Sequence, residues 1–264
     1  MEESGKKQQH FILVHGICQG AWCWYKLVTL LRSAGHSVTA VDLGATGVNP
    51  QRLDELHSMD DYVRPLFQAI ASLPPQQKPV LVGHSFGGAS VSLAMEKFPD
   101  KFSVAVFVTA VMPSTAVPMA ALADKFFKEH PLEAYLDSKV TIGTDPQNPW
   151  SRIEFGPEYM AKRLYQLSPA EDLTLGTLLV RPGSWFLGDL LRDGIVTEEK
   201  YGSVRRVFVV CKEDLAMTEG FQRWMIEASP GAQVEEIQGA DHMAMLSKPA
   251  DLCKLLLEIA ARYY

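Results

Sequence analysis

At residues 78–88 the chain reads Lys-Pro-Val-Leu-Val-Gly-His-Ser-Phe-Gly-Gly. An apolar run typical of a buried strand leads into Gly83-His84-Ser85-Phe86-Gly87, and a helical pattern follows. In this setting a G-x-S-x-G sequence predicts a nucleophile elbow, a sharp turn that presents the serine Oγ at the edge of a sheet. Glycines flank the serine because neighbouring Cβ atoms would block the turn. The stretch therefore predicts acyl transfer by a serine nucleophile.

Strand-like and helix-like segments alternate on both sides of this elbow. Period-two or fully apolar runs predict strands over residues 10–14, 37–43, 80–82, 103–108, 204–211 and 233–237. Helical spacing predicts helices over residues 21–34, 62–73, 86–98, 218–228 and 249–263. The fully apolar strand at 103–108 is expected when helices cover both faces of a sheet. The pattern predicts an α/β fold with a mostly parallel sheet and right-handed crossovers.

Between residues 112 and 191 the alternation stops. This segment carries many Met and aromatic residues, is punctuated by prolines, and shows no convincing strand pair. We expect an inserted, mainly helical cap at 112–191 over the active site, with residues 1–111 and 192–264 forming the core domain.

Composition excludes several classes of protein. A chain of 264 residues with 47% hydrophobic residues can bury the core of one large domain. The net charge of −6, without any block of Lys or Arg, does not fit a nucleic-acid-binding protein and suits a small neutral substrate better. A polar N-terminus without a signal sequence and the lack of a bilayer-length apolar run lead us to expect a cytoplasmic protein that binds no membrane. The four cysteines lack the spacing of a zinc or redox site, so reduced, buried thiols and no metal are expected.

The base and carboxylate that an activated serine requires are expected in loops at the carboxyl ends of strands. The strand ending at Cys211 is followed by Lys212-Glu213-Asp214, and the strand ending at Ile237 by Gly239-Ala240-Asp241-His242. The order Ser85, Asp214, His242 is that of α/β-hydrolases and differs from the orders in the chymotrypsin and subtilisin families. These three residues are the predicted catalytic triad.

Each member of this triad has a simpler reading. Ser85 would then be a serine in an ordinary turn. Asp214 would be a helix N-cap, and His242 would be a loop histidine without a catalytic role. Glu213 and Asp241 compete for the carboxylate role. Asp214 is preferred because it lies just past the strand, whereas Asp241, adjacent to His242, is expected to cap the turn.

The oxyanion hole requires two backbone N–H groups. The residue after the nucleophile, Phe86, is expected to supply one, and Ile17 in the loop after the first strand the other. Gly16 and Gly20 would let this loop approach the substrate. An ordinary loop between a strand and a helix, without any catalytic role, would contain such glycines as well. His84 lies on the wrong side of the elbow to act as the base, and we interpret it as a packing residue.

Taken together, these segments resemble the plant methylesterase family, which includes salicylate, jasmonate and indole-acetate methylesterases, polyneuridine aldehyde esterase and related hydroxynitrile lyases. The matching segments run nearly from end to end: residues 10–16, 20–26, 34–36, 83–88, 164–167, 201–204, 221–224 and 240–243. The resemblance implies an α/β-hydrolase fold, the same triad and oxyanion donors, no cofactor, and hydrolysis of a small methyl ester of the plant-hormone type. A homodimer is a further family expectation.

The resemblance also implies a substrate pocket of mostly apolar or aromatic residues. Its positions fall on Ile17, Phe86, Val111, Phe126, Tyr135, Val140, Ile153, Trp185, Leu215 and Met243. Without the family, such residues in a helical insert would more often belong to the core. Many relatives have a lysine where this chain has Leu215, and a smaller residue where it has Ile17, so the resemblance leaves the pocket shape open.

Two alternative functions follow from the same resemblance. Hydroxynitrile lyases of the family carry a threonine in place of Gly16 and a lysine in place of Met243, and neither residue is present here. Ester hydrolysis is therefore preferred over lyase chemistry. The fold also serves as a hormone receptor in which turnover is slow or absent, and tight product binding would distinguish that function.

Overall fold

The computed structural model describes residues 8–143, 150–192 and 194–263. The polar start of the chain and residues 144–149 of the expected cap lie outside the described residues.

Six strands form a parallel central sheet in the order β2-β1-β3-β4-β7-β8. They are β1 (His10–Val14), β2 (Ser37–Val41), β3 (Val80–Ser85), β4 (Val104–Ala110), β7 (Arg206–Cys211) and β8 (Gln233–Ile237). The strand order reverses beside β1, and in open α/β sheets such a switch point marks where ligands bind. The predicted parallel α/β architecture is confirmed.

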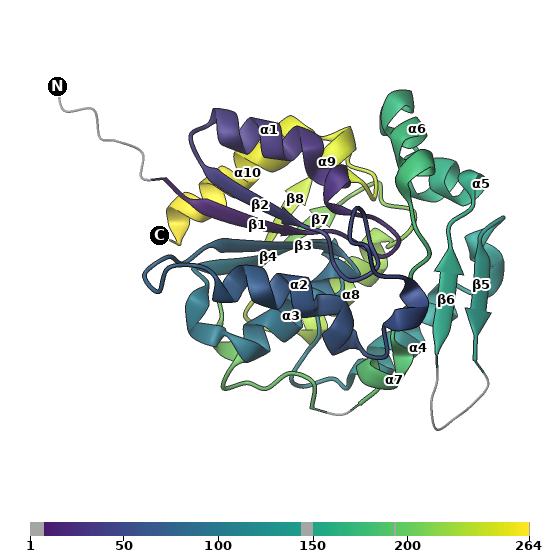
Figure 1. The fold of residues 1–264 in the computed structure, drawn as a ribbon, viewed down its shortest axis with the longest axis horizontal. Coiled ribbons are helices and arrows are strands. Elements are labelled where there is room, and N and C mark those ends of the chain that lie inside the picture. Colours follow the sequence, from purple (N-terminus) through teal and green to yellow (C-terminus); the bar gives the residue numbers. More distant parts are fainter. Residues whose placement is uncertain (1–7, 144–149, 193, 264) are drawn as a thin grey trace.

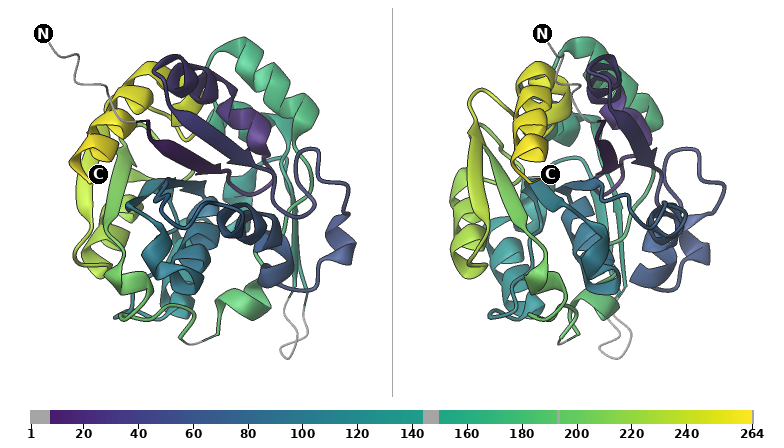
Figure 2. Two further views of the ribbon diagram at one scale, coloured as in Figure 1. Left: turned by 60° about the vertical axis from the view of Figure 1, so that its left-hand side comes forward. Right: turned by 90° about the vertical axis from the view of Figure 1, so that its left-hand side faces the viewer.

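Helices cover both faces of this sheet (Figure 1, Figure 2). One face carries α1 (Tyr25–Ser33), α9 (Ala244–Ser247) and α10 (Pro249–Arg262), and the other carries α2 (Met59–Ala71), α3 (Gly87–Lys97) and α8 (Glu219–Ala228). Double coverage explains why every residue of β4 and β7 is buried. Short 3-10 segments are η1 (Ala21–Trp24), η2 (Leu53–Glu55), η3 (Pro99–Lys101), η4 (Leu132–Tyr135) and η6 (Tyr201–Ser203).

The segment from 112 to 191 holds both helices and strands. Its helices are α4 (Met119–Glu129), α5 (Pro157–Tyr159), the π-helix η5 (Met160–Leu164), α6 (Ala170–Leu179) and α7 (Leu187–Leu190). The expectation that it contains no strand pair is wrong, because β5 (Lys139–Ile142) and β6 (Ser151–Glu154) pair antiparallel in a separate small sheet, which Figure 1 shows off the carboxyl ends of the central strands. These strands have four residues each, and most of β5 is exposed, so neither produces an apolar run.

Because all six strands run in one direction, their carboxyl ends share one edge of the sheet. The loops after β1, β3, β4, β7 and β8 therefore meet there. No helix among the described residues has both the length and the apolar character that a bilayer span requires.

Candidate active site

Ser85 is the last residue of β3, immediately before the N-terminus of α3. Its φ of 54° is a left-handed conformation that few non-glycine residues adopt. The glycines on either side are required by close packing: a β-carbon at Gly87 would lie 2.4 Å from the His15 oxygen, and one at Gly83 would lie 2.7 Å from Val91 Cγ2. The strained turn therefore has the geometry that the pentapeptide predicts.

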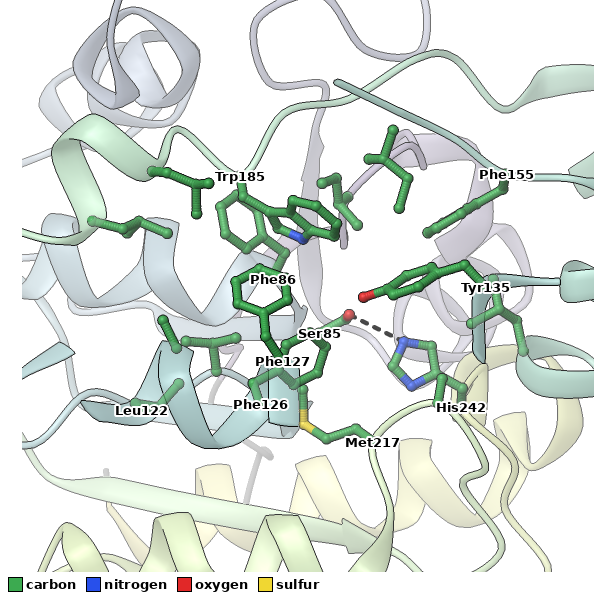
Figure 3. Close-up of a pocket in the computed structure, with 18 of the residues that line it drawn as sticks. Ser85, Phe86, Leu122, Phe126, Phe127, Tyr135, Phe155, Trp185, Met217 and His242 are labelled. Carbon is green, nitrogen blue, oxygen red and sulfur yellow. Dashed lines mark hydrogen bonds between the residues drawn. The ribbon is translucent and has the colours of Figure 1, made fainter. Parts of the chain in front are cut away.

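The loops after β7 and β8 bring two further polar side chains to this turn. His242 Nε2 lies 3.0 Å from Ser85 Oγ, the contact drawn in Figure 3. His242 Nδ1 lies 2.7 Å from Asp214 Oδ2. Because an ionised carboxylate only accepts hydrogen bonds, Nδ1 carries the proton and Nε2 is left to accept the serine hydroxyl proton.

The two competing carboxylates lie elsewhere. Glu213 is exposed to solvent. Asp241 is buried, and its Oδ1 accepts the Met243 N–H at 3.0 Å while its Oδ2 accepts from Leu167 N and Ser168 Oγ. Asp241 thus caps the turn, as expected, and ties it to the segment before α6.

The first loop lies directly against Ser85. A β-carbon at Gly16 would lie 2.8 Å from Ser85 Cβ and 3.3 Å from Ser85 Oγ. Within the described part of the chain, neither the Ile17 N–H nor the Phe86 N–H donates a hydrogen bond. An oxyanion hole needs N–H groups that are free to donate, and the absence of acceptors here is compatible with the role predicted for these two.

A cavity opens above Ser85, with about 810 Å³ of atom-free space including its mouth. Its wall is almost entirely apolar and aromatic, and the segment from 112 to 191 supplies most of it. Figure 3 shows the hydroxyl of Tyr135 pointing toward Ser85 and the His242 ring. Such a cavity suits a small ligand with an apolar body and one reactive polar group.

The structure brings most of the predicted pocket residues into this wall. Those that line it are Ile17, Phe86, Val111, Phe126, Tyr135, Ile153 and Trp185. Val140, Leu215 and Met243 do not line it. Leu215 points to solvent with 44% of its surface exposed, Met243 is fully buried beneath the His242 turn, and Val140 is half-buried on β5.

Sequence reasoning missed other lining residues. On α4 they are Met119, Leu122, Ala123 and Phe127, which join the predicted Phe126, and elsewhere they are Phe155, Tyr159, Leu164, Leu187, Leu190, Ala216 and Met217. The α4 set follows the spacing i, i+3, i+4, i+7, i+8, which marks one face of a helix. That periodicity was available in the sequence, but it does not tell whether the face meets a core or a cavity.

Cys18, Cys23, Cys211 and Cys253 are buried and form no disulfide. The described residues contain no group of three or more His, Cys, Asp or Glu side chains that is arranged to hold a metal ion.

Comparison with known proteins identifies the family. The model of the alpha/beta hydrolase family matches residues 11–255. Methyl jasmonate esterase 1 of Vitis vinifera is 52% identical over 259 residues, covering 98% of this chain and 99% of that protein. Salicylic acid-binding protein 2 of Nicotiana tabacum is 45% identical over 258 residues, covering 98% and 99% respectively.

A solved structure agrees with these relatives. Polyneuridine aldehyde esterase of Rauvolfia serpentina is 48% identical over 257 residues, covering 97% of each chain. The crystal structure of polyneuridine aldehyde esterase matches with a TM-score of 0.91, covering 96% of this chain and 100% of that one. This chain therefore belongs to the plant methylesterases of the alpha/beta hydrolase family and is a carboxylic ester hydrolase.

Proposed function

We propose that the protein hydrolyses small methyl esters through a catalytic triad of Ser85, His242 and Asp214. The observation that carries the proposal is the continuous chain of contacts from Ser85 Oγ to His242 Nε2 at 3.0 Å and from His242 Nδ1 to Asp214 Oδ2 at 2.7 Å. This chain ends at an apolar cavity that has room for an ester.

In the first half-reaction Ser85 Oγ attacks the ester carbonyl carbon while His242 Nε2 takes the hydroxyl proton. The Ile17 and Phe86 N–H groups bind the oxygen on which negative charge develops. The bond from carbon to the methoxy oxygen then breaks, and His242 gives its proton to that oxygen. Methanol leaves, and the acyl group remains on Ser85.

In the second half-reaction water attacks the acyl group, with His242 again taking the proton. The tetrahedral intermediate collapses, and His242 returns the proton to Ser85 Oγ as the free acid leaves. Asp214 keeps the His242 ring in one tautomer and stabilises its charged form in both halves.

The cavity wall supports an acyl group that is aromatic or aliphatic. Phe126, Phe127 and Trp185 present rings to the space above Ser85 (Figure 3). Among the described residues, no charged side chain other than His242, when protonated, lines this space. The name of the Vitis vinifera relative, a methyl jasmonate esterase, fits such a substrate. Methyl jasmonate, methyl salicylate and methyl indole-acetate are the candidates we propose.

We further propose that residues 112–191 act as a cap that selects among these esters. Their side chains form most of the cavity wall, whereas the nucleophile and base come from the core. Exchanging cap residues should therefore change substrate preference more than it changes the chemistry.

The geometry of the site does not favour lyase chemistry. A lyase would need a side chain at Gly16, where a β-carbon meets Ser85 at 2.8 Å, and a lysine at position 243, where Met243 is buried away from the cavity. A receptor would bind the free acid and turn over slowly.

The test is incubation of the purified protein with a panel of methyl esters, followed by measurement of the acids and methanol released. Ser85→Ala should lower kcat by at least about a thousandfold. Ser90→Ala is the matched control, because the Ser90 hydroxyl is buried on α3, finds no partner in the part of the chain that the structure describes, and its loss should leave kcat unchanged. Near-normal hydrolysis by Ser85→Ala would disprove the mechanism, and tight acid binding with negligible turnover by the wild type would favour a receptor.

A further inference from the structure

We propose that Thr109 is a positioning residue for the reaction, which orients Asp214 and limits how strongly that carboxylate attracts the proton on His242. The inference rests on the proposed function, since it concerns the same triad. It starts from one contact: Thr109 Oγ1 lies 2.6 Å from Asp214 Oδ2, and both side chains are buried.

The direction of this hydrogen bond follows from chemistry. An ionised carboxylate has no hydrogen to give, so the Thr109 hydroxyl is the donor. Asp214 Oδ2 also accepts the Nδ1–H of His242 at 2.7 Å. One carboxylate oxygen is therefore shared between the threonine and the base.

The other oxygen is equally occupied. Asp214 Oδ1 accepts the backbone N–H groups of Ala216 at 2.7 Å and Met217 at 2.8 Å. Four donors thus fix both oxygens of a buried carboxylate, and two of the four come from its own loop. Thr109 is the donor that belongs to a different strand, so it ties the position of Asp214 to the central sheet.

The backbone at Thr109 is distorted in a way that aims the side chain. In the pairing of β3 with β4, His84 lies opposite Val108 and Ser85 lies opposite Ala110, so Thr109 is the unpaired residue of a bulge. Its φ of 36° is a genuine outlier for a β-branched residue. Bulges beside active sites commonly redirect a side chain, and strained residues persist where their surroundings hold them.

The hydroxyl has a predictable effect on the base. A hydrogen bond to a carboxylate stabilises its charge, and the carboxylate then attracts a second proton less strongly. Removing the hydroxyl leaves Oδ2 with His242 alone. The charged form of His242 gains stability, and the free base that Ser85 requires appears at higher pH.

Three ionisable groups around the pair, His84, Tyr159 and Cys211, have pKa values shifted in the direction that keeps them neutral near pH 7. The ring centroids of His84, on β3, and His242 lie 4.7 Å apart with the planes tilted by 56°. Burial, followed by the charge of His242, lowers the pKa of His84 well below its usual value. Burial raises the pKa of Tyr159 and of Cys211 well above their usual values, and the charge of Asp214 adds to both shifts. The neighbouring Asp241 carboxylate is directed to Met243, Leu167 and Ser168 instead.

The experiment measures kcat and KM from pH 5 to 9 with the best methyl ester of the panel. Thr109→Val, which keeps the shape but lacks the hydroxyl, should lower kcat about three- to thirtyfold and move the acidic limb of kcat/KM to higher pH. KM should change little, because Thr109 does not line the cavity. Thr109→Ser, which keeps the hydroxyl, should leave the acidic limb of kcat/KM at the pH of the wild type.

Two further variants make the test decisive. Thr109→Ala removes the hydroxyl with less strain at this φ and serves if the valine variant does not fold. Ser92→Ala removes another buried hydroxyl, which donates to the Gly88 oxygen at 2.8 Å, and should affect thermal stability without moving the acidic limb. An acidic limb unchanged in the hydroxyl-free variants, or shifted equally in Thr109→Ser, overturns the inference. Absence of ester turnover in the wild type would instead overturn the proposed function.

Discussion

His84 donates its Nε2 hydrogen to the main-chain oxygen of His242 at 2.7 Å. Since a carbonyl only accepts, Nε2 carries the proton, and the buried Nδ1 has no partner among the described residues. His84 therefore holds the backbone of His242, which is a more specific role than the packing interpretation from the sequence. It performs this role as a neutral ring, because burial lowers its pKa well below the usual value.

This neutral state predicts a loss of stability in acid. The pKa of His84 is lower in the folded protein than the unfolded value of about 6.5, so the unfolded chain binds the proton first. The stabilising contribution is complete above about pH 6.5 and decreases as the pH falls from there toward the folded pKa. It decreases by up to about 1.4 kcal/mol per pH unit.

His84→Gln keeps an N–H donor and removes the titration. Denaturant unfolding at pH 7.5 and pH 5.5 should show a smaller difference in the free energy of unfolding for this variant than for the wild type. His57→Gln, at an exposed position, is the control and should match the wild type. If the free energy of unfolding changed equally between the two pH values in His84→Gln and in the wild type, His84 would not be the source of the acid instability.

Gly16 gives a steric prediction. A β-carbon there would lie 2.8 Å from Ser85 Cβ and 3.2 Å from His84 Nδ1, and Ser85 is held in a strained turn that has no free space. We expect Gly16→Ala to lower kcat/KM at least about tenfold by displacing the nucleophile. Gly220→Ala on α8, where a β-carbon meets nothing within 4 Å, should leave kcat/KM unchanged. Full activity in Gly16→Ala would contradict the prediction, because it would show that the loop moves to accommodate the β-carbon without displacing Ser85.

Much of this fold could be predicted from the sequence because its signals are local and periodic. Apolar runs marked the parallel strands, and loops after strands identified the region that holds Ser85, Asp214 and His242. The choice of Asp214 over Glu213 and Asp241 could only be argued from position. The structure distinguishes them by side-chain direction. The direction of the Asp214 side chain depends on the turn that follows β7 and on the N–H groups that donate to it there.

The features that the sequence did not reveal depend on tertiary structure. Thr109 belongs to a run that looks like a regular strand, and only the partner strand makes it the extra residue of a bulge. Leu215 and Met217 are two apolar residues in one short loop, yet one is exposed and the other lines the cavity. The strands β5 and β6 are too short to produce a periodic signal and are stabilised by each other.

Asp172 gives a prediction about stability. Its buried carboxylate accepts the Tyr25 hydroxyl at 2.7 Å and forms an ion pair with Lys26, and so connects α6 to α1. Asp172→Ala should reduce the free energy of unfolding by about 2 kcal/mol, because Tyr25 and Lys26 both lose their hydrogen-bond partner. The loss stays at this size because the Lys26 ammonium group can still be solvated by water. Chemical denaturation measures this. Asp124→Ala on α4, whose ion pair with Lys128 is exposed, should change stability by less than about 0.5 kcal/mol.

Met217 and Leu215 together test which residues shape the substrate cavity. The Met217 side chain is 3% exposed and lines the cavity, whereas Leu215 is 44% exposed. Met217→Ala enlarges the cavity, so the ratio of kcat/KM for a bulky over a small methyl ester should rise about five- to a hundredfold, the range that one or a few methylene contacts give. The backbone N–H that Met217 donates to Asp214 is retained in this variant, so the chemistry should persist.

Leu215→Ala is the matched control and should leave the ratio of the two esters unchanged, because its side chain meets solvent. Measurement of kcat/KM for the same two esters with both variants compares two neighbouring truncations in one loop. If Leu215→Ala changed the ratio and Met217→Ala did not, the family-based expectation for Leu215 would hold and the cavity seen here would not be the substrate site.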